Sequence, residues 1–510
     1  MSAAGLSKTA LTTVVAAICL LIAVPLSYLV IRVFEADDAG HLFWRARTVR
    51  LALHTVALAG VVTSVSLVLG VGLAVAAVRL VGGRPLMVGL LAAPLAVPSY
   101  VAGFAWTRLF PGFEGFWAAV LVLGAACYPL VLLPVAASLS ASGRAWEDAA
   151  RSLGRGPWNV FATVTLRRVR PAAAGGALLV ALYALGDFGG PASVRFDSFT
   201  VGIYNAYHGS FDRTLPAVYS VALIAAALVL AGAERRLRRH DVAPITATER
   251  APVRRHRLPV RAAAWTAMTG VLVVGIVIPV AALIGEIGRS RRLAARSVRQ
   301  IVEWLWPDVT ATVGYALVGA AAVTLPAIAS ALFTARPRRR GAGTAEAISY
   351  LGYALPGVTV GLAFVFVGIR LGRDFYLTPG LLIACYAVLF LPLAVGPIRA
   401  GFDATSGGVN EVSRTLGAGP WETLLRVRLP LVAPGIAAGA LLAGLTIAKE
   451  LPATLLLRPI GTQTLATHMW SLSNDLATGE AAVLGLVLIA VTALPTAMLS
   501  AFLFAKGGTR

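Results

Sequence analysis

The hexapeptide L-G-R-G-P-W at Leu153–Trp158 returns as L-G-A-G-P-W at Leu416–Trp421, 263 residues further along the chain. Two other matches keep nearly this spacing. A-C-Y-P-L-V-L-L-P at Ala126–Pro134 corresponds to A-C-Y-A-V-L-F-L-P at Ala384–Pro392, 258 residues later. At the same offset of 258, Ala96-Val97-Pro98 corresponds to Ala354-Leu355-Pro356. Three matches in one order and at nearly one spacing indicate an internal repeat.

The repeat predicts two homologous halves, residues 1–234 and 262–510, joined by an Arg- and Pro-rich linker at 235–261. Of the 510 residues, 58% are hydrophobic and only 13% are charged, whereas soluble chains average about 45–50% and about 25%. This composition excludes a soluble globular enzyme and a disordered protein. It predicts an all-α polytopic membrane protein with about 12 transmembrane helices.

We place the spans at about 10–31, 51–80, 86–108, 116–140, 171–190, 216–233, 262–284, 311–335, 345–369, 379–400, 434–450 and 480–505. Each half then has six spans. Because six is even, both halves enter the membrane in the same direction and form two parallel six-helix repeats.

Loop charges predict the sidedness. Arginines are concentrated between spans four and five, six and seven, and eight and nine, and these loops are predicted to be cytoplasmic by the positive-inside rule. The Arg-rich stretch 286–308 falls on the predicted outer side. Because Trp304 and Trp306 follow its arginines, we expect an amphipathic helix lying at the outer interface.

Charge and cysteine usage argue against a nucleic-acid-binding protein, a disulfide-stabilised protein and a metalloprotein. Lys and Arg outnumber Asp and Glu by 44 to 23, but the basic residues lie between apolar runs, so we predict contact with membrane lipid and no nucleic acid. Cys19, Cys127 and Cys385 lie inside apolar runs, and no His/Cys cluster has zinc spacing. We therefore predict neither a disulfide framework nor a metal site.

The best-matched segment of each half is the loop between its fourth and fifth spans. Asp148 and Glu411 lie near a predicted helix start, where an acid favours the positive end of the helix. Next to them are small residues, which permit close packing against a partner. The Gly-x-Gly-Pro-Trp run then breaks this helix and starts another, with proline tolerated in the first turn. We expect a short helix across the end of the bundle, able to dock on a cytoplasmic partner.

These loops resemble the EAA loop of binding-protein-dependent ABC importer permeases, in which an acid and two small residues precede a glycine and an I-x-L-P run. Half two departs from that pattern at Val412 and Ser413, and half one at Arg167, where proline is usual. The resemblance extends from the second span to the last. It implies ATPase-coupling residues in both loops: Asp148, Ala149, Ala150, Gly154, Gly156, Pro157, Glu411, Gly417, Gly419 and Pro420.

Two further segments are similar to ferric-iron importer permeases, in which two permease halves are commonly fused. They are K-E-L-P-A-T-L-L-L-R-P at Lys449–Pro459 and G-D-F-G-G-P at Gly186–Pro191. Thiamine and aminophosphonate importers carry related segments, so these solutes, or another small one, remain alternatives to ferric iron.

The resemblance implies a multi-pass permease in the plasma (inner) membrane of a prokaryote, with an external substrate-binding protein and a cytoplasmic ATP-binding subunit in two copies. The chain itself is expected to be no enzyme, with no catalytic residue and no bound cofactor. Lys8, Lys449 and Lys506 all lack the preceding glycine that a P-loop needs. ATP and Mg²⁺ are therefore assigned to the partner subunit.

Asp187, Lys449 and Glu450 end the fifth span of each half. An acid at membrane depth is a candidate for a translocation pathway or a gate. The alternative is that these helix ends lie at the outer interface, with Lys449 neutralising Glu450. Tyr204, Tyr207, His208 and His468 fall in the following outer loops and are weaker candidates for contact with substrate or its carrier.

Two other classes of membrane protein would require different sequence features. A secondary transporter driven by an ion gradient could also have parallel six-span repeats, but it needs no repeated acid–glycine loop. An intramembrane enzyme needs paired His/Asp or Ser/Lys residues within spans, and we find none in the sequence.

The topology is testable by thiol labelling. In a version with its three cysteines replaced, single cysteines at Gly154 or Gly417 should resist an impermeant thiol reagent in intact cells, whereas cysteines within 286–308 should react. Labelling of the glycine positions from outside would contradict the 12-span topology.

Overall fold

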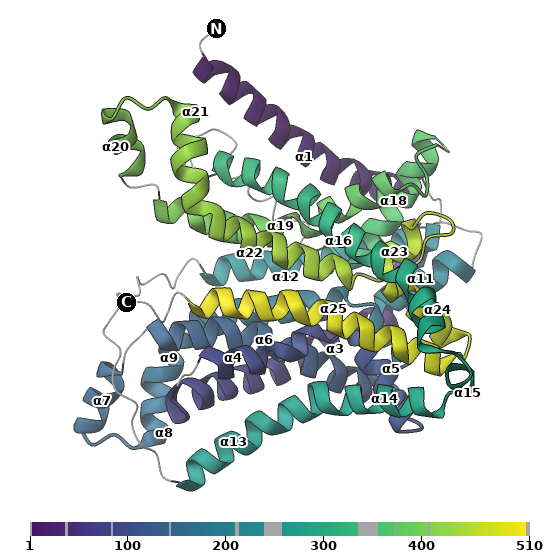
Figure 1. Cartoon of the computed structure of the whole chain (residues 1–510), viewed down its shortest axis with the longest axis horizontal. Helices are drawn as coiled ribbons and strands as arrows, with labels where there is room; N and C mark the ends of the chain where they lie inside the picture. Colours follow the sequence, from purple (N-terminus) through teal and green to yellow (C-terminus); the bar gives the residue numbers. More distant parts are fainter. Residues whose placement is uncertain are drawn as a thin grey trace. The chain divides into compact units, whose positions relative to one another are not determined.

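The computed structural model describes residues 3–35, 39–82, 85–141, 144–209, 214–238, 258–334, 355–372, 374–405 and 408–505. Within these ranges every regular element is a helix, so the all-α fold class is confirmed (Figure 1). Residues 239–257 of the predicted linker and 345–354 of the predicted ninth span lie outside the described ranges.

Apolar helices account for the predicted spans. Within the described ranges, nine are long and apolar enough to cross a membrane: Val15–Phe34, Ala46–Leu80, Phe116–Ala141, Pro157–Gly186, Leu258–Arg289, Val298–Phe333, Pro379–Asp403, Thr423–Ala448 and Thr478–Met498. A pair of helices, Leu86–Ala96 and Ser99–Leu109, is bent by 78° at its break, and Thr214–Leu230 and Gly357–Arg370 are shorter apolar helices. Each of the twelve predicted spans overlaps one of these.

The chain packs as two compact units. Unit 1 comprises residues 1–44, 203–224 and 290–495, and unit 2 comprises 45–202, 225–289 and 496–510. The helices that lie wholly in unit 2 are α3 (Ala46–Val75), η1 (Ala76–Leu80), α4 (Pro85–Ala92), η2 (Ala93–Ala96), α5 (Ser99–Leu109), α6 (Phe116–Ala141), α7 (Ala145–Ser152), α8 (Pro157–Val160), η3 (Phe161–Thr165), α9 (Leu166–Gly186), α10 (Gly189–Ser193), α13 (Leu258–Leu272), η4 (Val273–Val277) and α14 (Ile278–Arg289).

The helices that lie wholly in unit 1 are α1 (Ala3–Phe34), α2 (Ala39–Trp44), α15 (Arg291–Ala294), α16 (Val298–Thr334), α18 (Gly357–Leu371), α19 (Pro379–Thr405), α20 (Val409–Thr415), α21 (Pro420–Glu422), η6 (Thr423–Arg428), α22 (Leu429–Ala448), α23 (Pro452–Leu457) and α24 (Leu465–Asn474). Three helices cross the unit boundaries: α11 (Phe199–Gly209), α12 (Thr214–Arg238) and α25 (Thr478–Ala505).

Three long helices form the core of each unit. In unit 2, α3, α6 and α9 pack on one another, and in unit 1 the corresponding helices are α16, α19 and α22. Gly176 shows how closely α9 approaches α6, because a Cβ added there would lie 2.7 Å from the Cα of Val131. Small residues at such contacts let membrane helices gain van der Waals packing without a hydrophobic driving force.

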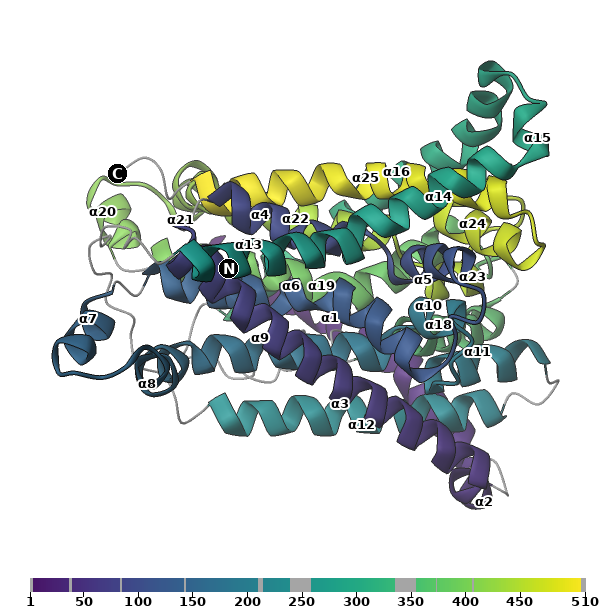
Figure 2. The same cartoon turned by 90° about the horizontal axis from the view of Figure 1, so that it is seen from below.

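The first span of each predicted half packs with the core of the other half. α1 contacts α16 and α18 within unit 1, although it opens the first half of the sequence (Figure 1). α13 and α14, which open the second half, pack along η1, α4 and α5 within unit 2 (Figure 2). The predicted halves 1–234 and 262–510 follow sequence similarity, and packing divides the chain differently.

The repeated prolines start corresponding helices. Pro98 precedes α5 with φ −62° and ψ 143°, and Pro356 precedes α18 with φ −64° and ψ 138°. Proline fits these positions because its fixed φ suits the residue before a helix and its missing N–H costs nothing there. The short sequence match that indicated the repeat therefore marks a repeated break in the backbone.

The expectation of an amphipathic interfacial helix at 286–308 is wrong. α14 continues to Arg289, the short α15 follows, and α16 starts at Val298, so that Trp304 and Trp306 lie in the first turns of a long spanning helix. Packing explains the sharp turn. Leu293 is buried, and a Cβ on Gly479 of α25 would lie 2.3 Å from the Cβ of Ser290 and 3.4 Å from Leu293.

Candidate functional site

The first repeated turn connects α7 to α8. α7 ends at Ser152, and Gly154 follows with φ +81°, a left-handed conformation that glycine adopts at little cost. The N–H of Gly154 donates to the carbonyl of Arg151 at 2.9 Å, and the N–H of Arg155 donates to the carbonyl of Ala150 at 3.2 Å. These two bonds form a Schellman motif, which ends an α-helix. Pro157 then opens α8.

The second turn repeats this backbone. α20 ends at Thr415, Gly417 has φ +82°, and the N–H of Ala418 donates to the carbonyl of Ser413 at 2.9 Å. α21 then begins at Pro420. The sequence match between the two hexapeptides is thus a match between two left-handed glycine turns of the same design.

A π-helix follows each turn. η3 leads from α8 into α9, and η6 leads from α21 into α22. π-helical segments are rare and occur frequently at functional sites. Each turn is consequently continuous with a core helix of its own unit.

The predicted residues of these turns are mostly exposed. In α7, Asp148 forms a 3.6 Å ion pair with Arg151 one turn later, Ala149 is exposed and Ala150 is buried. A Cβ added at Gly154, Gly156, Gly417 or Gly419 would meet no atom within 4 Å. Glu411 belongs to α20. The two turns therefore have free space around them, as a docking surface requires.

Both turns present large apolar side chains at matching positions. Leu153 and Leu416 are each 80% exposed, and Trp158 and Trp421 are 76% and 55% exposed. Exposed apolar residues that are gathered in one place indicate a contact surface for a protein or a membrane. Sequence reasoning noted the tryptophans only as part of the repeat and did not assign them to this surface.

Glu147 is a buried acid of α7 that sequence reasoning did not single out. It is 7% exposed, and its Oε1 accepts hydrogen bonds from Arg79 Nε at 3.2 Å and from Thr165 Oγ1 at 3.1 Å. Arg144 donates to the backbone carbonyl of Arg79 at 2.9 Å. Glu147 thus connects α7 to η1, at the end of α3, and to η3, at the start of α9. Its only signal in the sequence is an acid directly before Asp148.

Half two holds its turn by other contacts. Counted 263 residues on, the positions of Glu147 and Thr165 are taken by Asn410 and Arg428. The guanidinium of Arg428 lies over the ring of Phe402 at 4.9 Å, and Ser413 and Thr423 are buried. The two turns therefore share their backbone but not their electrostatics.

Asp187 and Glu450 lie at corresponding positions and act as helix caps. Asp187 Oδ2 accepts from the N–H of Gly190 at 2.7 Å at the start of α10, and both of its carboxylate oxygens accept from Ser99 Oγ at the start of α5. Glu450 accepts from the N–H groups of Ala453 and Thr454 at 3.0 and 2.9 Å, at the start of α23. A Cβ on Gly357 of α18 would lie 2.9 Å from Glu450 Oε1.

These caps explain the acids at the ends of the fifth spans. Each carboxylate satisfies backbone donors at a break in a helix, where unpaired N–H groups would be costly. Lys449 is the C-cap residue of α22 and is half-buried. The three predicted pathway residues therefore lie at the breaks that follow α9 and α22.

The aromatic and histidine candidates form two groups in unit 1. The ring of His208 contacts that of Tyr204 in a tilted arrangement and that of Tyr207 edge-on, at ring-centroid distances of 4.5 and 5.2 Å. Burial raises the pKa of Tyr204, and its hydrogen bond with Trp470 and the charge of Arg458 partly offset this. His468 of α24 hydrogen-bonds through Nδ1 with the buried Asp308 of α16. Within the described residues no group of three His, Cys, Asp or Glu side chains is arranged to hold a metal ion.

Comparison with known proteins agrees with this architecture. The sequence profile described as "Binding-protein-dependent transport system inner membrane component" matches residues 66–239 and 322–506, once in each half. The Fe(3+)-transport system permease protein FbpB 2 of Haemophilus influenzae is 27% identical over 504 residues, covering 97% of this chain and 98% of that protein.

Shorter matches extend over parts of the chain. The putative 2-aminoethylphosphonate transport system permease protein PhnV of Salmonella typhimurium is 29% identical over 147 residues, covering 29% of this chain and 56% of that protein. The molybdenum transport system permease protein ModB of Escherichia coli is 31% identical over 147 residues, covering 26% of this chain and 64% of that protein.

Glu147→Ala should loosen α7, whereas Asp148→Ala should not. The first change leaves Arg79 without its carboxylate in a nearly buried site, where loss of one partner costs about 3–5 kcal/mol. The second removes an exposed pair worth about 0–1 kcal/mol. Limited trypsin digestion of the purified protein should cleave after Arg151 and Arg155 faster in Glu147→Ala alone. Equal rates in both variants would show that Glu147 does not anchor the turn.

Proposed function

The chain belongs to the family of binding-protein-dependent transport system inner membrane components, and we propose that it is the membrane-spanning permease of an ATP-driven importer for ferric iron. The observation that carries the substrate assignment is the similarity to a Fe(3+)-transport permease over almost the full length of both proteins. The phosphonate and molybdenum relatives match only about a quarter of the chain, so these solutes are the alternatives.

ATP hydrolysis is assigned to a separate cytoplasmic subunit, in two copies, one for each turn. That subunit would bind the ATP and Mg²⁺, and an external binding protein would deliver the iron. The family name of the matching profile, which includes the words binding-protein-dependent, supports the external binding protein. Support for the two ATPase copies comes from the two turns, which have the same backbone and expose Leu153 and Trp158 in one half and Leu416 and Trp421 in the other.

The contacts of the first turn suggest how a movement of the ATPase reaches the pathway. Docking on α7 would pull on Glu147, which is bonded to Arg79 at the end of α3 and to Thr165 at the start of α9. α3 and α9 are two of the three core helices of unit 2. A displacement of α7 would thus be transmitted to the core through hydrogen bonds and not through a flexible loop.

In the second half the transmission runs through the backbone. α20 packs on η6, which continues into the core helix α22. At the other ends of α9 and α22, Asp187 and Glu450 cap short helices and face the starts of α5 and α18. We assign Asp187, Glu450 and Lys449 to a gate. The carboxylate oxygens of Asp187 and Glu450 accept hydrogen bonds from backbone N–H groups, and these bonds suit the two acids to hold the segments at the break in position.

The substrate is testable by uptake. Proteoliposomes containing the chain, its ATPase and its binding protein should accumulate radioactive ferric iron in an ATP-dependent manner. Excess unlabelled ferric iron should abolish the signal, and molybdate, sulfate or 2-aminoethylphosphonate should not. ATP-dependent uptake of one of these anions, with no uptake of iron, would reassign the substrate while leaving the importer intact.

The coupling role is testable at the glycine turns. Gly154→Asp together with Gly417→Asp should abolish copurification of the ATPase and lower uptake at least about fivefold, since a loss of about 1–3 kcal/mol of coupling corresponds to a 5–150-fold effect. The added charges lie on the proposed docking surface. Insertion into the membrane should be normal.

Gly112→Asp provides the matched control. Gly112 has φ +84° and no atom within 4 Å of an added Cβ, so its backbone cost equals that at Gly154 and Gly417. It lies between α5 and α6, at the opposite end of α6 from α7. The control should retain ATPase binding and uptake. If the double variant did so as well, these turns would not be the coupling surface.

A further inference from the structure

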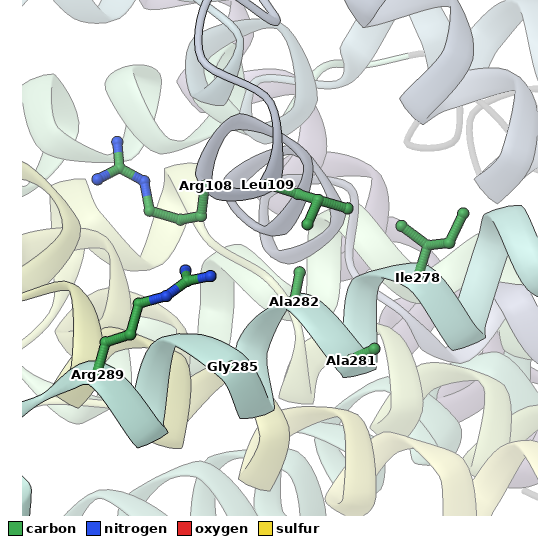
Figure 3. Close-up of a pocket in the computed structure, with 7 residues that line it drawn as sticks. All are labelled: Arg108, Leu109, Ile278, Ala281, Ala282, Gly285 and Arg289. Atoms are coloured by element: carbon green, nitrogen blue, oxygen red, sulfur yellow. The ribbon is translucent and has the colours of Figure 1, made fainter.

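A cavity of about 160 Å³ lies between α5 and α14, both in unit 2. Arg108 and Leu109 line it from the end of α5, and α14 contributes one side of its last three turns, including Arg289. Figure 3 shows the two arginine side chains coming from these opposite walls at the same end of the cavity, with the guanidinium group of Arg289 turned toward Ala282 and that of Arg108 turned the other way. At about 30 Å³ per water molecule, the space accommodates a phosphate group with its ester carbons.

The walls of the cavity are apolar below the arginines. Ile278, Ala282 and Gly285 lie three or four residues apart and form one stripe of α14, with Ala281 beside them. Val277 and Ile284 form the adjoining stripe and are 54% and 57% exposed. Because α13 to α14 is a membrane-spanning helix with only 28% of its apolar window buried, this adjoining stripe faces lipid tails.

The charges at the cavity are unbalanced. Arg289 Nη1 pairs with Glu286 Oε2 at 3.1 Å, and the guanidinium of Arg108 lies over the ring of Phe104 at 5.8 Å. Arg108 and Arg289 together with Glu286 carry a net charge of +1. A singly charged phosphodiester balances this charge, and guanidinium groups bind phosphate oxygens in a forked geometry that lysine cannot reproduce.

The cavity lies at the end of unit 2 away from the α7–α8 turn. α6 begins at Phe116, shortly after α5 ends, and reaches Ala141 just before α7. In Figure 2 the ends of α5 and α14 accordingly lie far from α7. Trp117, at the start of α6, is 73% exposed. Exposed tryptophans are typical of the headgroup level of a bilayer, so the arginines lie at the depth where lipid phosphates are found.

From this combination we infer that the cavity between α5 and α14 binds the headgroup of an anionic phospholipid. Arg108 and Arg289 bind the phosphodiester, and the apolar stripe of α14 leads the attached glycerol and acyl chains into the bilayer. A free inorganic anion has the same phosphate chemistry but gains nothing from Ile278 and Ala281. A zwitterionic lipid adds a cation to a cavity that is already positive. The inference does not depend on the substrate of the transporter.

Native mass spectrometry of the full-length purified chain tests this assignment. Phosphatidylglycerol should bind more tightly than phosphatidylcholine of the same acyl chains. The double variant Arg108→Gln with Arg289→Gln should lower the affinity for phosphatidylglycerol by about 30-fold, because each arginine at a membrane surface contributes about 1 kcal/mol to the binding of an anionic lipid. Arg291→Gln with Arg292→Gln is the matched control, because it removes the same charge from exposed arginines of α15 that do not line the cavity.

Four outcomes would overturn the proposal. Equal binding of the two lipids excludes an anionic headgroup site, and equal weakening by both double variants excludes this cavity. Inorganic phosphate that displaces phosphatidylglycerol at equal concentration identifies a free-anion site and not a lipid site. Arg108→Lys with Arg289→Lys guards against misfolding. It keeps the charge and loses the forked geometry, so it should bind phosphatidylglycerol more weakly than the unaltered chain yet still prefer it to phosphatidylcholine. Loss of that preference in folded protein would also contradict the proposal.

Discussion

Within a membrane, a break in a helix leaves backbone N–H and C=O groups that water cannot satisfy, and this constraint governs the whole structure. The chain satisfies it at each repeated break with a residue from its own sequence. Pro98 and Pro356 start helices without an N–H of their own. Asp187 and Glu450 accept from the first N–H groups of α10 and α23. Two of the three matches that reveal the repeat, at Pro98/Pro356 and at the L-G-x-G-P-W hexapeptides, therefore lie where the backbone is interrupted, whereas the third lies within the continuous helices α6 and α19.

The same constraint explains what the sequence could predict. Helix breaks require particular residue types, so Gly154, Gly417 and the prolines after them indicated two turns that the structure places with φ +81° and +82°. Spans could be found because apolar runs of sufficient length have few alternatives to a helix. The bend of 78° between α4 and α5 and the continuous start of α16 could not be derived in this way, because they depend on tertiary contacts such as that of Leu293 with Gly479.

The missed site residues have a related cause. Glu147 lies next to the acid that the family pattern selects, and its role depends on Arg79, which is 68 residues away in the sequence. Arg108 and Arg289 are separated by 181 positions and come from different predicted halves. Neither pair has a local spacing that a single sequence reveals. Motifs can indicate where the chain turns, but contacts between distant segments decide which charges meet.

The cavity between α5 and α14 exists because the first span of each predicted half packs with the core of the other half. α14 comes from the second predicted half yet packs on α5 of the first, within unit 2. The segments before these two helices also pack closely, because a Cβ added at Gly275 of η4 would lie 3.1 Å from Pro94 of η2. The cavity lies between these two helices, with Arg108 on α5 and Arg289 on α14 among its lining residues. A bound phosphodiester would contact both guanidinium groups and hold α14 against the half to which it is not joined in sequence.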